Sequence, residues 1–231
     1  MDDFLTIGWP YWGIGAAAVL LVLLFTTDRF RSDTRIPRFY DLAWLAWLPV
    51  AAYAIHQFEE HGIDLLGDAY PFRGSLCQML GYAQAATCPV PVSFITAVNI
   101  PLVWLSLPLS ALLGRRRPLV ALSAFSVPAV NAVAHIVPGI LRLGYNPGLA
   151  TAIVMFVPLS IWAVRVARTR YKISTRQLAV VIASGVIVHA VLGGALLLFL
   201  HGVLNEVVLD TVESLDMFVP LAVALSLGEP K

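Results

Sequence analysis

Six stretches of about 20 apolar residues recur along the chain, and each is long enough to cross the ~30 Å hydrocarbon core of a membrane. Within lipid, only helices and closed barrels satisfy every backbone polar group, so the choice of fold is narrow. A mean hydropathy of +0.81 and a charged fraction of 13% also indicate an integral membrane protein. We expect an all-α, polytopic transmembrane helix bundle with six spans, near residues 9–27, 42–61, 93–113, 118–141, 148–167 and 177–201.

Basic residues predict the orientation of this bundle. Arginines and lysines gather in the connections after the first, third and fifth stretches, and such residues mark cytoplasmic loops. Both ends of a six-span bundle would then lie outside the cytoplasm. The run Arg115, Arg116 and Arg117 is best explained as a topology signal, with phosphate binding as the alternative. We expect an integral protein of the bacterial cytoplasmic membrane with no nucleic-acid partner, and the sequence does not indicate its oligomeric state.

The end of the chain is harder to place. We divide the protein into a transmembrane bundle, residues 1–202, and a C-terminal tail, residues 203–231. Residues 207–227 are long enough to span but contain Asp210, Glu213 and Asp216. An amphipathic or re-entrant helix at the outer surface is the favoured interpretation. The alternative is a seventh span that brings Asp210 and Glu213 to a polar site.

The two cysteines, Cys77 and Cys88, lie in one polar loop on the expected outer side. In an oxidising compartment they could form a disulfide. Two cysteines alone are weak evidence, so two free thiols remain the alternative.

The second stretch ends with the sequence His56-Gln57-Phe58-Glu59-Glu60. On a helix, residues three and four apart share a face, so the histidine and both glutamates can point the same way. Ionisable side chains are costly in a bilayer and usually mark a functional site. This spacing suits a metal ligand set or a general acid–base pair equally well.

Six polar residues from three spans fall in one layer in the outer half of the membrane: His56, Glu59, Glu60, Asn99, Asn131 and His135. His56 lies about 8 Å below the outer end of its helix, at 1.5 Å per residue. We predict His56, Glu59 and His135 as metal ligands, with Glu60 as a further ligand or the general base. Asn99 and Asn131 would orient them. His61 is expected to be a loop residue, and His189 to be structural.

The connection after the fourth stretch reads Arg142-Leu143-Gly144-Tyr145-Asn146-Pro147-Gly148. Its Asn-Pro-Gly sequence is typical of a tight turn, with proline second and glycine free to adopt positive φ. Arg142 lies two helical turns after His135 and could contact a substrate or pair with a glutamate. A snorkelling interfacial arginine is the alternative. Tyr145 is a second candidate for substrate contact.

His56-Gln57-Phe58-Glu59-Glu60, the later His135 and Tyr145-Asn146-Pro147-Gly148 together resemble the HXXEE-domain family of integral membrane proteins. The family's three elements, HxxEE, a second histidine and Tyr-x-Pro-Gly, occur here in the same order. The signature covers about residues 42–165. The resemblance implies a membrane enzyme whose activity is not established, so it supports the site and not a substrate.

Several functions fit these residues. Two imidazoles and one or two carboxylates suit a divalent metal, with zinc favoured over iron. Zinc would support hydrolysis of a membrane lipid or a lipid-soluble small molecule, whereas iron would support oxidation. A metal-free His/Glu pair could instead catalyse isomerisation or cyclisation of an apolar substrate. A small-molecule transporter is a further alternative, and so is a purely structural network in which the glutamates pair with Arg142 or Arg73.

Overall fold

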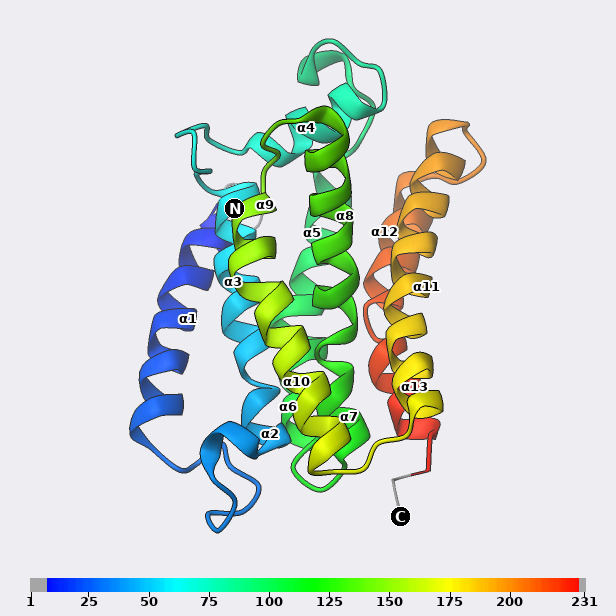
Figure 1. The fold of residues 1–231 in the computed structure, drawn as a ribbon. Coiled ribbons are helices and arrows are strands. Elements are labelled where there is room, and N and C mark those ends of the chain that lie inside the picture. Colours follow the sequence, from blue (N-terminus) through cyan, green and yellow to red (C-terminus); the bar gives the residue numbers. More distant parts are fainter. Residues whose placement is uncertain (1–7, 229–231) are drawn as a thin grey trace.

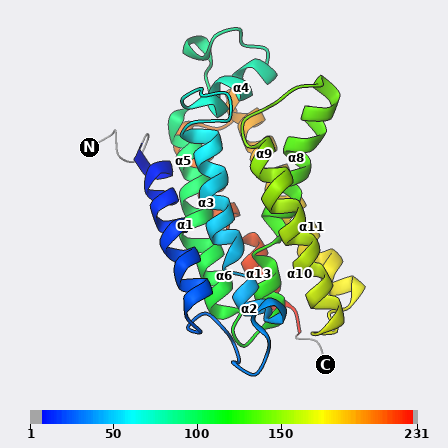
Figure 2. The ribbon, with the colours of Figure 1, turned by 60° about the vertical axis from the view of Figure 1, so that its left-hand side comes forward.

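The computed structural model describes residues 8–228, and every named element in it is a helix, which confirms the all-α prediction. Most of the helices run side by side along one common direction (Figures 1 and 2). In chain order the elements are α1 (Trp9–Thr26), η2 (Arg38–Tyr40), α2 (Leu42–Leu45), α3 (Leu48–His61), α4 (Pro71–Met79), η3 (Ala85–Thr87), α5 (Val92–Pro101), η4 (Leu102–Ser106), α6 (Leu107–Leu113), α7 (Pro118–Ser123), α8 (Ser126–Arg142), α9 (Leu149–Thr151), η5 (Ala152–Phe156), α10 (Val157–Thr169), α11 (Thr175–Leu200), α12 (Glu206–Asp216) and α13 (Val219–Ser226).

Within residues 8–228, five helical segments are long and apolar enough to cross a membrane, which indicates an integral membrane protein. They are Trp9–Thr26, Val92–Leu113, Pro118–Arg142, Leu149–Thr169 and Thr175–Leu200. Six or seven crossings therefore remain a prediction.

The expected second span is divided into two helices, and this is why it is not among the five. Helix α2 ends at Leu45, and α3, with 14 residues, starts at Leu48. Pro49 lies at the start of α3, where no helical hydrogen bond needs its missing N–H. A proline at this position cannot continue a helix from the preceding residues. The break leaves a short helix that carries the ionisable residues at its far end.

Two other prolines are accommodated without a break. Residues 102–106 and 152–156 form π-helical stretches, η4 and η5, directly before Leu107-Pro108 and Val157-Pro158. A π-helical turn widens the ladder by one residue, so the proline ring avoids the carbonyl that it would otherwise meet. The helices on either side therefore continue as one segment.

The segment formed by α7 and α8 is the centre of the bundle. In its most apolar window 61% of the residues are buried, against 22–39% in the other four candidate spans. Helix α8 packs along α11 and against η5, while α1 packs along α3. Gly185 of α11 lies so close to the backbone of Ser126 that a β-carbon would not fit there, so a small residue sets this approach.

The two ends of the bundle differ. Helix α4 and the loop that follows it cover one end (Figure 1), and Cys77 and Cys88 form a disulfide there. The connections rich in arginine lie at the opposite end, where the guanidinium group of Arg115 donates to the carbonyl oxygen of Arg31 at 3.1 Å. This separation of basic loops from the disulfide loop fits the orientation predicted from charge.

The tail does not lie flat across the disulfide end. Helices α12 and α13 run back along α5 and α11 toward the basic end (Figure 1). There the guanidinium group of Arg117 donates to the carbonyl oxygens of Leu225 and Leu227. The described part of the chain therefore ends beside the basic loops, and not at the opposite end as a six-span topology implies. Whether the tail crosses a membrane stays a prediction.

Candidate metal centre

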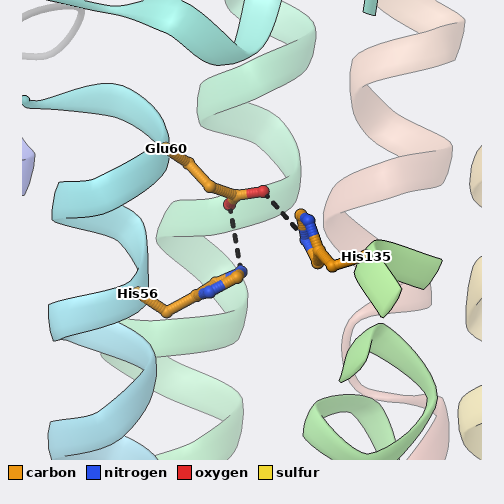
Figure 3. Close-up of side chains that lie close together, drawn as sticks. All are labelled: His56, Glu60 and His135. Atoms are coloured by element: carbon orange, nitrogen blue, oxygen red, sulfur yellow. Dashed lines mark ion pairs between the residues drawn. The ribbon is translucent and has the colours of Figure 1, made fainter. Parts of the chain in front are cut away.

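Three buried side chains from two helices converge on one point (Figure 3): His56 and Glu60 of α3, and His135 of α8. Helical spacing places the first two on one face of α3, and the packing of the bundle brings α8 opposite them. His56 Nε2 lies 3.4 Å from Glu60 Oε2, and His135 Nε2 lies 3.2 Å from Glu60 Oε1. One ligand atom from each residue lies within 4.8 Å of the others, so a single metal ion could touch all three.

A hydrogen-bond chain determines which nitrogen of His56 carries the proton. The Thr151 hydroxyl donates its hydrogen to an oxygen that can only accept, either the Glu59 carboxylate at 2.5 Å or the Gly148 carbonyl at 3.2 Å. The same hydroxyl lies 2.7 Å from His56 Nδ1, so it must accept a hydrogen from that nitrogen. His56 Nε2 is then a bare acceptor, and Asn131 Nδ2 donates to it at 3.0 Å. A metal ion bound to this nitrogen beside Glu60 would replace the hydrogen bond from Asn131.

His135 is fixed in the same way by a different partner. Its Nδ1 lies 2.9 Å from Asn146 Oδ1, and the amide nitrogen of Asn146 donates to the backbone carbonyl of His135 at 3.0 Å. With the amide so oriented, its oxygen accepts from Nδ1–H, and Nε2 is the nitrogen that faces Glu60. Orientation of a metal-binding histidine through its other nitrogen is typical of metal sites.

Glu59 does not join this cluster. Its carboxylate accepts hydrogen bonds from the backbone N–H groups of Ala150 and Thr151, at 3.0 and 2.8 Å, and from the Tyr145 hydroxyl at 2.8 Å. These N–H groups belong to the first turn of α9, where an intrahelical partner is lacking, so Glu59 caps that helix from α3. The prediction placed Glu59 among the ligands. The structure instead links it to His56 through the Thr151 hydroxyl, by two hydrogen bonds.

Tyr145 lies in the connection between two candidate spans and is partly buried. Burial, followed by the hydrogen bond to Glu59, raises the pKa of its phenol well above the ordinary value of 10. The phenol therefore stays protonated at neutral pH and donates to the carboxylate. Tyr145 also lines the cavities beside the site, as a substrate contact would.

The predicted turn is present and lies directly on the cluster. Leu149 N donates to the Asn146 carbonyl at 3.0 Å, and Gly148 has φ 89° and ψ −11°, the values of the third position of a type II turn. A β-carbon on Gly148 would lie 2.6 Å from His56 Cε1 and 2.7 Å from His135 Cε1. Glycine is thus required twice, for the positive φ and for the contact with both imidazoles.

A third imidazole, that of His61, also lies near Glu60, although the sequence predicts His61 to be a loop residue. His61 ends α3 and is buried, and its Nε2 lies 3.5 Å from Glu60 Oε2. Asn99 donates from Nδ2 to the same nitrogen at 3.3 Å, so Asn99 contacts His61 and not the ligand group. Nothing in the local sequence distinguishes His61 from a loop residue, because its burial depends on Trp9 and Phe72 packing on its ring.

No arginine in residues 8–228 pairs with either glutamate of the motif. Arg73 donates instead to three carbonyl oxygens of the disulfide loop, those of Ala85, Cys88 and Val90. Arg142 is exposed at the C-terminal end of α8 and lines the cavity beside the site. A structural network based on arginine–glutamate pairs is therefore not what holds these carboxylates.

The acidic residues of the tail lie elsewhere. Asp210 and Glu213 are not among the residues that converge on His56, although Glu213 is fully buried. Both oxygens of its carboxyl group lack a hydrogen-bond partner among the described residues. The suggestion that the tail supplies further ligands to this centre finds no support in the geometry.

The family described as "Protein of unknown function with HXXEE motif" matches residues 47–163, just over half of the chain. The chain belongs to the HXXEE family. The matched range contains all three predicted motifs together with Thr151, and thus every residue of the cluster and of its hydrogen-bond chains. Neither the curated proteins nor the solved structures yielded a match.

Proposed function

We propose that this protein is a metal-dependent membrane hydrolase that acts on a lipid-soluble or lipid-linked substrate. The observation that carries the proposal is the pair of histidines whose Nδ1 hydrogens are engaged by Thr151 and Asn146. Their Nε2 atoms flank the carboxylate of Glu60. An acid–base pair needs one oriented imidazole, whereas two imidazoles that are both held through Nδ1 fit a ligand set.

The separations between these atoms suit zinc. Ligand bonds of 2.0–2.1 Å in a tetrahedron place neighbouring ligand atoms about 3.3 Å apart. The imidazoles lie 3.4 Å from Oε2 and 3.2 Å from Oε1 of Glu60, and one ligand atom from each residue lies within 4.8 Å of the others. Two histidines and one glutamate form a ligand set of catalytic zinc sites and leave one position open for water. The same set also binds iron(II), so the metal must be identified by measurement.

When bound, zinc would lower the pKa of water at the open position and polarise a carbonyl or phosphoryl oxygen of the substrate. The residues of the chain supply the rest. Of the two glutamates that the sequence predicts as ligands, Glu60 would hold the metal with His56 and His135, and Glu59 would not. His61 Nε2, which accepts from Asn99, is placed to take a proton beside Glu60. A vestibule of about 810 Å³, lined by His61 and Tyr145, lies beside the site and provides room for water.

A metal-free acid–base enzyme is the second candidate, since the carboxylate of Glu60 lies within ion-pair distance of three imidazoles, His56, His61 and His135. In that case Glu60 and His135 would exchange a proton with an apolar substrate. The two candidates differ in one measurable respect, because only the hydrolase requires zinc.

The test is hydrolysis of p-nitrophenyl dodecanoate and of bis(p-nitrophenyl) phosphate by protein in nanodiscs, after chelation and after addition of zinc. We expect zinc-dependent cleavage of at least one probe by the wild type, and its loss in Glu60→Gln and His135→Ala. His201→Ala is the matched control, because His201 is exposed at the end of α11 and far along the chain from the motif. Cleavage that is equal with and without zinc, or retained in Glu60→Gln, would contradict the proposal.

A further inference from the structure

A mainly apolar cavity of about 320 Å³ extends from the candidate metal centre into the bundle. Glu60, Asn131 and His135 line it on the side of the site. The remaining wall is formed mostly by apolar residues of α5, α8, α11 and the end of α12, among them Val98, Leu102, Val127, Leu192, Leu196 and Met217. The wall is therefore mainly apolar, and its other polar side chains include those of Ser75, Gln78, Asn99, Arg142, Tyr145, Asn146 and His189.

Helical spacing shows that several residues of this wall lie on the packed faces of their helices. Val188, Leu192 and Leu196 are four residues apart and line the cavity from one face of α11. Leu197 and Leu198, on the opposite face, are exposed where lipid would lie. On α8 the lining extends from Val127 to Arg142, about 22 Å at 1.5 Å per residue. The space is therefore long and narrow.

The volume limits what can occupy such a space. Ligand-binding cavities in proteins range from about 300 to 1,000 Å³, and this one is at the lower end. It can hold one hydrocarbon chain but not the two chains of a diacyl lipid. Arg142 lines the outer end and forms no ion pair with any described residue, so an anionic group at the head of the chain would find a cation there.

We propose that the cavity between α5, α8 and α11 binds the single apolar chain of an anionic amphiphile, and holds its polar end between Arg142 and the Glu60–His135 edge of the centre. This inference rests on the proposed function, because it identifies the substrate class of the same site. It assigns substrate contact to Val98, Leu192 and Met217, none of which belongs to the motifs. A cavity lined mainly by apolar side chains favours an apolar chain over a polar solute.

The experiment is photolabelling of the protein in nanodiscs with a saturated fatty acid that carries a diazirine in mid-chain. Labelled residues are identified by mass spectrometry. We expect labelling at Val98, which is buried in the bundle, and suppression of that label by excess unlabelled fatty acid. Leu105 is half exposed on the same segment and should be labelled from the bilayer without competition. Labelling at Leu105 alone would overturn the proposal.

Two tryptophan variants provide a matched pair. Leu192→Trp fills the cavity and should lower labelling at Val98 about tenfold. Leu197→Trp places the same side chain on the exposed face of α11, five residues further along, and should leave that labelling unchanged. Equal labelling in both variants would refute the assignment. If Leu192→Trp does not fold, the competition experiment on the wild type decides alone.

The zinc content of the same wild-type sample separates this inference from the function on which it rests. Bound zinc without competed labelling at Val98 would refute the chain-binding cavity and leave the metal centre in place. Competed labelling without zinc would retain the cavity and refute the metal-dependent hydrolase.

Discussion

Substitution of Gly148 by alanine tests whether the Tyr-x-Pro-Gly turn shapes the candidate metal centre. The new β-carbon would lie 2.6 Å from His56 Cε1, 2.7 Å from His135 Cε1 and 3.0 Å from Glu60 Cγ, so it contacts all three predicted ligands at once. The backbone at φ 89° adds conformational strain for any residue other than glycine.

The magnitude follows from these two effects. A non-glycine residue in a sparsely populated backbone region costs about 1–3 kcal/mol. An overpacked buried contact costs about 1–3 kcal/mol more. The imidazoles cannot shift without loss of the hydrogen bonds to Thr151 and Asn146. We therefore expect a loss of about 2–6 kcal/mol in the free energy of unfolding, with zinc affinity lowered about 10–100-fold.

The assay is thermal unfolding in detergent together with zinc competition against a chromogenic chelator. Gly144→Ala is the matched control in the same loop, because a β-carbon there meets only the Arg142 carbonyl oxygen, at 3.7 Å. It should change the zinc affinity by less than about twofold. If Gly148→Ala bound zinc as tightly as Gly144→Ala does, the turn would not support the centre and the geometry argued above would be refuted.

Three further predictions test the surroundings of the site. Thr151→Val removes the hydroxyl between Glu59 and His56 and should weaken zinc binding about tenfold, whereas Thr151→Ser should restore it. Equal zinc affinity in the wild type and both variants would show that this hydrogen-bond chain does not orient His56. Because the pKa of Tyr145 is raised, the folded protein keeps a phenol proton that the unfolded chain loses near pH 10. The resulting stabilisation is present below pH 10 and is lost as the pH rises through the folded-state pKa. Alkaline difference absorbance of wild type against Tyr145→Phe should place this ionisation above pH 10, and a titration at 10 would contradict it. Cys77 and Cys88 in intact cells should react with a membrane-impermeant maleimide only after reduction, whereas labelling without reduction would place free thiols, and not a disulfide, at that end of the bundle.

Much of the helical architecture could be predicted, because length and composition of an apolar stretch decide whether it forms a membrane helix. The common layer of His56, Asn131 and His135 follows from the same simple rule of 1.5 Å per residue. The turn at Asn146-Pro147-Gly148 was also predictable, since proline and glycine restrict the backbone locally. Each of these features depends on residues close together in the chain.

The different contacts of Glu59 and Glu60 could not be predicted in this way. Glu59 and Glu60 are both compatible with the face of His56, at three and four residues' distance. Which one reaches His135 depends on where the first turn of α9 packs, and the N–H groups of Ala150 and Thr151 draw Glu59 away. Thr151 itself carried no signal, because threonine is common in membrane helices.

The packing of the tail could not be predicted for a related reason. Asp210, Glu213 and Asp216 suggested a helix at a water interface, but two of them are buried against neighbouring helices. Packing of α12 on α5 and α11, which is a tertiary property, overrides the local pattern. The break between α2 and α3 likewise combines a proline with contacts that the sequence does not reveal.

X-ray absorption at the zinc edge of the purified, zinc-loaded protein tests the central claim most directly. We predict about one zinc per chain, with two imidazole nitrogens at about 2.0–2.1 Å and light oxygen ligands completing the shell. His135→Ala should lose one imidazole from that shell, and His201→Ala should lose none. Less than a tenth of an equivalent of zinc, or a zinc shell unchanged in His135→Ala, would contradict a metal centre formed by His56, Glu60 and His135.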